Sequence, residues 1–173
     1  MENLINDLRS TLAAFESTFL SCPKEQINEV PFPGSWTVGQ LVKHMAMAND
    51  GFTDVFNGPT TETSRPADLN ATQIKTILED LNNKMKSPDF VYPILKDYDY
   101  DRLHADLRAV ENKLTNIIGK LDWTKTCTAF ELPVFGYLTR LEVVYFIVYH
   151  TRRHTHQLNK MIEQLKNAKT ETV

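Results

Sequence analysis

Four long stretches of the chain repeat their apolar residues with alternating spacings of three and four. They cover residues 2–20, 37–56, 99–121 and 139–165. Side chains at these spacings share one face of an α-helix, so each stretch has a side that can pack into a core. The pattern therefore predicts an all-α protein built as a four-helix bundle.

Two of these helices have a clear start signal. Thr37 is followed three residues later by Gln40, and Thr139 is followed by Glu142. In such a capping box, the threonine hydroxyl and the later Gln or Glu side chain each accept a hydrogen bond from the other residue's backbone N–H. We therefore expect the second helix to start at Thr37 and the fourth at Thr139.

The connections between the predicted helices are long. They span about 16, 42 and 17 residues, whereas helix–helix connections in bundles usually take two to eight. The longest connection carries a short amphipathic stripe, which predicts an extra helix closed by Ser87-Pro88; its apolar residues are Ile74, Ile77, Leu78, Leu81 and Met85. Because an up-down-up-down bundle has short loops, we expect at least one crossover connection.

Composition and charge narrow the class of protein. The 173 residues suit a single domain covering residues 1–173; 42% are hydrophobic, 24% are charged, and the net charge is -3. This balance argues against a basic nucleic-acid-binding surface. The longest apolar run, residues 143–149, is far too short to cross a bilayer, and residues 1–10 lack the pattern of a signal peptide. We therefore expect a cytoplasmic protein without a membrane or nucleic-acid partner.

The two cysteines, Cys22 and Cys127, lie far apart and form no C-x-x-C motif. This arrangement is typical of reduced thiols in a cytosolic protein. Cys22 ends a helix beside Pro23, and Cys127 lies among threonines without a neighbouring histidine or cation that would favour a thiolate. We therefore expect neither to be a nucleophile.

Histidines interrupt the apolar face of the last helix. His150 and His154 are four residues apart, so their rings share one side of the helix about 6 Å apart along its axis, and both can reach one metal ion. His44 faces inward from the second helix. Two buried imidazoles could also be core residues bonded to hydroxyls such as Thr151 or Thr155. The spacing alone leaves both interpretations open.

The other two histidines are expected in solvent, because His104 shares its helix side with Arg108 and Glu111, and His156 lies in a polar line with Lys160. Three inward imidazoles are a sufficient ligand set for a mononuclear metal site with an open position. The sequence has no thiolate set for structural zinc, no ferritin-like E-x-x-H pair and no H-E-x-x-H motif. Haem ligation by bundle histidines remains an alternative.

Several motifs together resemble those of the DinB-like family. They are Ser35-Trp36-Thr37 before the second helix, His44 seven residues after that threonine, Phe135-Gly136 and Thr139 before the last helix, and His150-x-x-x-His154-x-x-Gln157. The resemblance covers nearly the whole chain. It implies a four-helix bundle with a long crossover and a site for one divalent metal ion. By this resemblance His44, His150 and His154 are the metal ligands.

The resemblance also implies chemistry on small molecules. Some family members transfer or rearrange groups with low-molecular-weight thiols, others are putative metal-dependent hydrolases, and others have no assigned reaction. We therefore expect a metal-dependent enzyme, in the first place a low-molecular-weight-thiol S-transferase. A metal-dependent hydrolase and a non-enzymatic, stress-related metal- or ligand-binding module are the alternatives.

The catalytic group would then be a thiol or a water at the open metal position. Gln157, one helical turn beyond His154, is a candidate helper that could hydrogen-bond this group. Zinc or nickel is expected first, with manganese, iron or cobalt as alternatives, because imidazole accepts several first-row ions. The expected partner is a small-molecule substrate, and the apolar run at residues 143–149 suits either a homodimer or full burial in a monomer.

Overall fold

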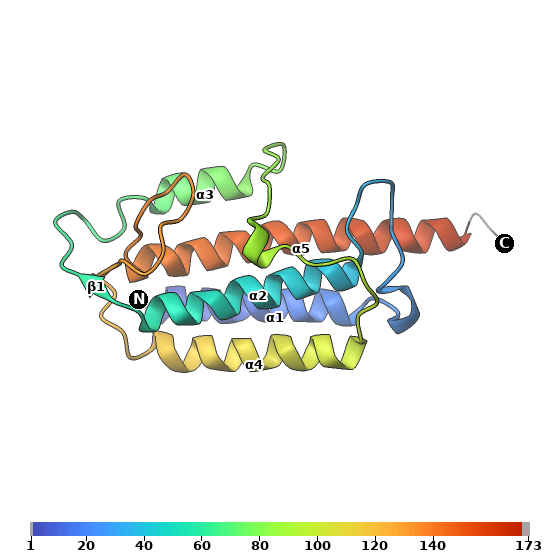
Figure 1. The fold of residues 1–173 in the computed structure, drawn as a ribbon, viewed down its shortest axis with the longest axis horizontal. Helices are drawn as coiled ribbons and strands as arrows, with labels where there is room; N and C mark the ends of the chain where they lie inside the picture. Colours follow the sequence, from blue (N-terminus) through green and yellow to red (C-terminus); the bar gives the residue numbers. More distant parts are fainter. Residues whose placement is uncertain (1, 171–173) are drawn as a thin grey trace.

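The computed structural model describes residues 2–170, and its framework is four long α-helices (Figure 1). They are α1 (Glu2–Leu20), α2 (Val38–Asn57), α4 (Tyr100–Ile118) and α5 (Arg140–Thr170). The connections contain α3 (Ala71–Glu79), the 3-10 turns η1 (Lys24–Gln26) and η2 (Asp89–Val91), and the antiparallel strand pair β1 (Thr60–Thr61) and β2 (Thr126–Cys127). The predicted all-α bundle with a short extra helix is confirmed.

The helix directions show where the crossover lies. In Figure 1, α1 and α5 run one way along the bundle, and α2 and α4 run the other way. α2 packs mainly against α4, and α1 packs mainly against α5, so both principal pairs are parallel. Parallel neighbours cannot be joined by a tight turn. The connection of residues 58–99, which carries α3 on the outer side of α5, is therefore the predicted crossover.

Both predicted capping boxes are present. The Thr37 hydroxyl accepts a hydrogen bond from the Gln40 N–H at 3.1 Å, and the Gln40 Oε1 accepts one from the Thr37 N–H at 3.0 Å. At α5 the Thr139 hydroxyl accepts from the Glu142 N–H at 3.1 Å, and the Glu142 Oε2 accepts from the Thr139 N–H at 2.9 Å. Both threonines are thus cap residues, and each helix begins one residue later.

The short helix ends earlier than its apolar stripe predicts. α3 stops at Glu79, and Asp80 takes an extended backbone conformation. The Asp80 carboxylate accepts a hydrogen bond from the Asn82 N–H at 3.0 Å, which stabilises a turn instead of another helical turn. Leu81 and Met85 therefore lie outside the helix, and their side chains are exposed. At the other helix ends, α4 stops at residue 118 and α5 continues to residue 170.

The apolar core consists of two clusters that follow each other along the bundle. Along α5, the fully buried members of the first cluster end at Val148, and those of the second begin at Leu158. His150 and His154 lie in the interval between them. The histidine pair therefore lies in the part of α5 that separates the two apolar clusters. Within residues 2–170, no helix is long and apolar enough to cross a membrane.

Candidate metal centre

α2 and α5 bring the three predicted histidines together. His44 on α2 is buried, and His150 and His154 on α5 are partly buried. One ligand atom from each ring can be chosen so that all three lie within 4.8 Å of one another. Among the described residues, this is the only group of three or more His, Cys, Asp or Glu side chains close enough to hold a metal ion.

The two α5 imidazoles turn the same ring nitrogen toward each other. The Nε2 atoms of His150 and His154 are 3.0 Å apart. Two nitrogen ligands of one tetrahedral zinc ion, each about 2.0–2.1 Å from it, lie about 3.3 Å apart. The observed separation is therefore close to the spacing of two ligands on one ion.

Hydrogen bonds orient two of the rings. The His44 Nδ1 lies 2.8 Å from the Val91 carbonyl oxygen, and the His154 Nδ1 lies 2.9 Å from the Gln157 Oε1. Carbonyl oxygens only accept, so each Nδ1 carries the proton and each Nε2 keeps its lone pair. This is the usual outer arrangement of a metal-binding histidine, in which the second nitrogen donates to a fixed acceptor.

Threonine hydroxyls do not satisfy the histidines. The Thr155 hydroxyl donates to the Thr151 carbonyl at 2.8 Å, and the Thr151 hydroxyl is buried without a partner in the described part of the chain. The His150 Nδ1 is likewise buried and has no partner there. The alternative of core histidines bonded to these two hydroxyls is therefore wrong.

Burial keeps the three imidazoles neutral. It is the largest cause that lowers the pKa of His44, and the bond to the Val91 carbonyl opposes it only in part. Burial also lowers the pKa of His154 to about 3, with the neighbouring His44 acting in the same direction. The pKa of His150 is lowered well below its ordinary value by burial and by the other two histidines. Neutral imidazole is the form that binds a metal, so the set is ready for a cation at neutral pH.

Arg153 places a positive charge beside the site. Its proximity contributes to the lowered pKa values of His150 and His154. The guanidinium donates to the carbonyls of Leu78 at 3.2 Å and Asp80 at 2.7 Å, and also to that of Asn83. These bonds hold the end of α3 against α5. Among the described residues, no carboxylate forms an ion pair with Arg153.

Aromatic rings enclose the histidines. Trp36, just before α2, lies tilted against His44 with ring centroids 5.3 Å apart. Phe146, one turn before His150 on α5, stacks on that ring at 5.3 Å. Flat apolar groups beside the imidazoles reduce their contact with water and restrict their rotation.

The other predicted polar residues fall in different places. Gln157 uses its Oε1 to hold the His154 ring, so in this structure it positions a histidine, while its predicted contact with a bound water or thiol stays a prediction. His156 is exposed, as predicted. His104 is a correction, because it is only partly exposed and its Nε2 lies 2.7 Å from the Glu16 carboxylate on α1. Its charged helix neighbours gave no sign of this partner on another helix.

Both cysteines are buried free thiols. Burial raises the pKa of Cys22 to about 11 and also raises the pKa of Cys127, although the nearby Arg140 acts in the opposite direction on Cys127. The sequence neighbours of Cys127 did not reveal this arginine. Since burial outweighs its charge, the thiolate is still disfavoured at both positions.

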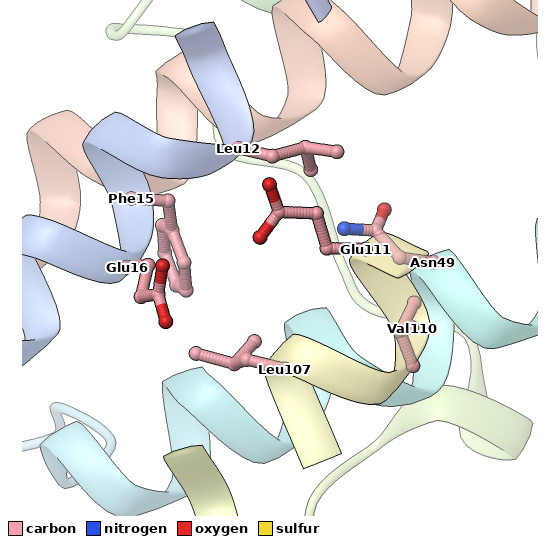
Figure 2. Close-up of a pocket in the computed structure, with 7 residues that line it drawn as sticks. All are labelled: Leu12, Phe15, Glu16, Asn49, Leu107, Val110 and Glu111. Carbon is pink, nitrogen blue, oxygen red and sulfur yellow. The ribbon is translucent and has the colours of Figure 1, made fainter. Parts of the chain in front are cut away.

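Two hollows lie elsewhere in the bundle. A cavity of about 20 Å³ lies between α1, α2 and α4 (Figure 2). Apolar side chains line it together with three polar ones, Glu16, Asn49 and Glu111. This volume suits about one water molecule. A groove of about 430 Å³ between α1 and α5 has mostly small and polar lining residues, including exposed His156. Neither hollow is lined by the three clustered histidines.

The sequence did not reveal the residues that fasten the crossover. Arg65 binds the Glu142 carboxylate with both guanidinium nitrogens at 2.6 Å, and the Asn70 N–H donates to the same carboxylate at 2.8 Å. Glu142 is fully buried. Burial alone would raise its pKa, but the bonds from Arg65, Thr139 and Asn70 outweigh it, so the pKa is lowered. One carboxylate thus caps α5 and holds the crossover to it.

Comparisons with known proteins agree with this architecture. YuaE, an uncharacterised protein of Bacillus subtilis (strain 168), is 23% identical over 146 residues, which cover 83% of this chain and 88% of YuaE. Among solved structures, YfiT from Bacillus subtilis matches with a TM-score of 0.60 and 16% identity, over 95% of this chain and 87% of YfiT. YfiT is described as "a probable metal-dependent hydrolase with an unusual four-helix bundle topology". The DinB superfamily matches residues 7–158, and this chain therefore belongs to the DinB superfamily.

Proposed function

We propose that this chain is a divalent-metal-dependent enzyme that acts on a small molecule. The observation that carries the proposal is the convergence of His44, His150 and His154, whose ligand atoms lie within 4.8 Å of one another. Three imidazoles can hold an ion and leave a position for a further ligand, as in catalytic zinc sites. Zinc or nickel is the expected ion, and manganese, iron or cobalt are alternatives.

The reaction that we propose is S-transfer from a low-molecular-weight thiol. A divalent ion held by the three imidazoles supplies positive charge that favours the deprotonated form of a thiol or a water beside it. Arg153 adds positive charge near His150 and His154 and so favours an anionic group beside them. In the transfer, the thiolate sulfur forms a bond to an electrophilic carbon, and the leaving group departs with the electron pair of the broken bond.

The shortage of proton acceptors favours S-transfer over hydrolysis. A free thiol has a pKa of about 8.5 and bulk water one of about 15.7, so beside the same ion a thiol loses its proton to solvent more readily than a water does. In the described part of the chain, no carboxylate hydrogen-bonds to the three histidines or is among the groups that shift their pKa values. Among the residues that the structure describes, no carboxylate is therefore bonded to the cluster as a candidate general base.

Metal-dependent hydrolysis is the second candidate. It is favoured by the shared fold with YfiT, which is described as a probable metal-dependent hydrolase. A module that binds a metal or ligand without catalysis is the third. Both use the same three histidines, so the reaction has to be tested with substrates.

The test compares metal-loaded and metal-free protein. Cobalt-substituted protein should change its visible spectrum when a small thiol is added, and loaded protein should consume thiol together with an electrophile while metal-free protein is inactive. The rate should rise with pH through the apparent pKa of the bound thiol and then level off. His156→Ala, which alters an exposed histidine on the same helix, is the matched control and should behave as the unaltered protein.

Other outcomes would select the alternatives. Turnover of esters or amides without any thiol, with inhibition when a thiol is added, would replace S-transfer by hydrolysis. If metal-loaded protein shows no spectral response to thiols and turns over no ester, amide or electrophile, the chain is better explained as a binding module without catalysis.

A further inference from the structure

The segment between α3 and α4 exposes several large hydrophobic side chains. Twelve large hydrophobic side chains are exposed among the described residues, and six of them fall within residues 81–95. We call these six the apolar rim: Leu81, Met85, Phe90, Tyr92, Ile94 and Leu95. Scattered exposed apolar residues are ordinary, but a concentration of them marks a surface that binds something.

Hydrogen bonds fix this segment beside the candidate metal centre. The Val91 carbonyl in η2 accepts from His44 at 2.8 Å, and the Ser87 hydroxyl lies 3.4 Å from the same Nδ1. Two residues beyond Val91, the Pro93 carbonyl accepts from the Gln40 side chain at 3.2 Å. Figure 1 shows the segment passing α2 and α5 at the middle of the bundle. The part of the segment around Val91, which carries Phe90 and Tyr92 of the apolar rim, is therefore held next to His44 by α2.

A series of ring contacts links the rim to His44, one of the three proposed metal ligands. Tyr92 lies edge-on to Trp36 with centroids 5.5 Å apart, and Trp36 lies 5.3 Å from His44. Phe90, also on the rim, lies edge-on to Phe130 at 5.5 Å. An apolar group that reaches the histidines from this side would touch aromatic surface.

We propose that the apolar rim binds the apolar part of the small molecule whose reacting group lies at the three histidines. This inference rests on the proposed metal-dependent function. It assigns the substrate class as compounds with an aromatic or alkyl group attached to an anionic or electrophilic centre. Two features support this occupant. Phe90 and Tyr92 of the rim flank Val91, whose carbonyl accepts a hydrogen bond from His44. Arg153, which forms no ion pair with a described carboxylate, places positive charge near His150 and His154.

Simple carboxylates provide the probe, because their carboxylate can occupy the open metal position while their chain length is varied. Calorimetric titration of zinc-loaded protein with acetate, butanoate, hexanoate and phenylacetate should show tighter binding along the series. Full burial of each added methylene would tighten binding by up to about fourfold. A metal site with no apolar surface beside it would give equal affinities.

The matched variants are Tyr92→Ala on the rim and Tyr137→Ala elsewhere, because the two side chains are nearly equally exposed, at 49% and 48%. Tyr92→Ala should reduce the gain in affinity between acetate and hexanoate severalfold. Phe90→Ala should act in the same direction. Tyr137→Ala should keep the full gain.

Several results would overturn the inference. If acetate binds but affinity does not rise with chain length, the rim inference fails while the metal site stands. If the protein takes up no metal, the proposed function fails and the inference fails with it. If Tyr92→Ala abolishes binding to phosphatidylcholine vesicles, or dissociates a dimer seen by sedimentation, without changing the carboxylate series, the rim serves a membrane or a second copy instead.

Discussion

The neutral state of His154 predicts how the metal-free protein responds to acid. Its pKa is lowered to about 3, mainly by burial and then by His44 and Arg153, while the bond to Gln157 acts in the opposite direction. In the unfolded chain the same imidazole has its ordinary pKa of about 6.5. Between these two values, the unfolded chain takes up a proton that the folded chain does not.

The sign and size of the effect follow from this difference. Above pH 6.5 both states are neutral and His154 has no effect, whereas from pH 6.5 down to about pH 3 each step favours unfolding. Each pH unit is worth about 1.4 kcal/mol for one group, so lowering the pH from 7 to 5 should cost at most about 2 kcal/mol through His154. His150, whose pKa is also lowered, adds in the same direction. Glu142 has a lowered carboxyl pKa, so its stabilising effect is lost only below its ordinary value of 4.5.

Urea unfolding of chelator-treated protein, followed by far-ultraviolet circular dichroism at pH 7, 6 and 5, measures this loss directly. His154→Gln cannot take up a proton in this range, so it should reduce the loss of unfolding free energy by up to about 2 kcal/mol. His156→Gln is the matched control and should keep the loss seen in the unaltered protein, because His156 is exposed. Equal pH dependence in the unaltered protein and in His154→Gln would refute the reasoning.

Three further substitutions test other parts of the account. Glu142→Gln should lower the unfolding free energy by about 2–4 kcal/mol, because it weakens both the buried ion pair with Arg65 and the cap of α5. A thermal unfolding midpoint within about 2 °C of that of the unaltered protein would contradict this. Replacing Cys22 and Cys127 together by serine should leave metal content and turnover intact, since burial disfavours both thiolates; an inactive but metal-loaded protein would show a catalytic cysteine. His104→Ala should cost at most about 1 kcal/mol in a denaturant titration without changing metal content, so any loss of metal would contradict its placement away from the cluster.

The helical framework could be predicted because its signals are local. The capping boxes at Thr37 and Thr139 involve residues only three positions apart, and the inward direction of His150 and His154 follows from the helical period. The end of α3 was predicted wrongly because the apolar stripe continues through Leu81, while the turn at Asp80 ends the helix. Leu81 and Met85, which lie beyond that turn, are exposed on the surface.

The surroundings of the site depend on contacts that spacing cannot show. The acceptor for His44 is the backbone carbonyl of Val91, and every residue type has such a carbonyl. The partners Arg65 and Glu142 are brought together only when the crossover lies along α5. Likewise, His104 meets Glu16 only because α4 packs beside α1. Sequence periodicity could identify the ligand candidates but not the groups that orient them.

The most direct test of the central claim is the metal content of protein purified without added metal, measured by elemental analysis. The unaltered protein and His156→Ala should each contain about one divalent ion per chain, and His150→Ala should lose most of it while remaining folded. His44→Ala and His154→Ala should lose it as well. Full metal occupancy in folded His150→Ala would contradict the proposed three-histidine site.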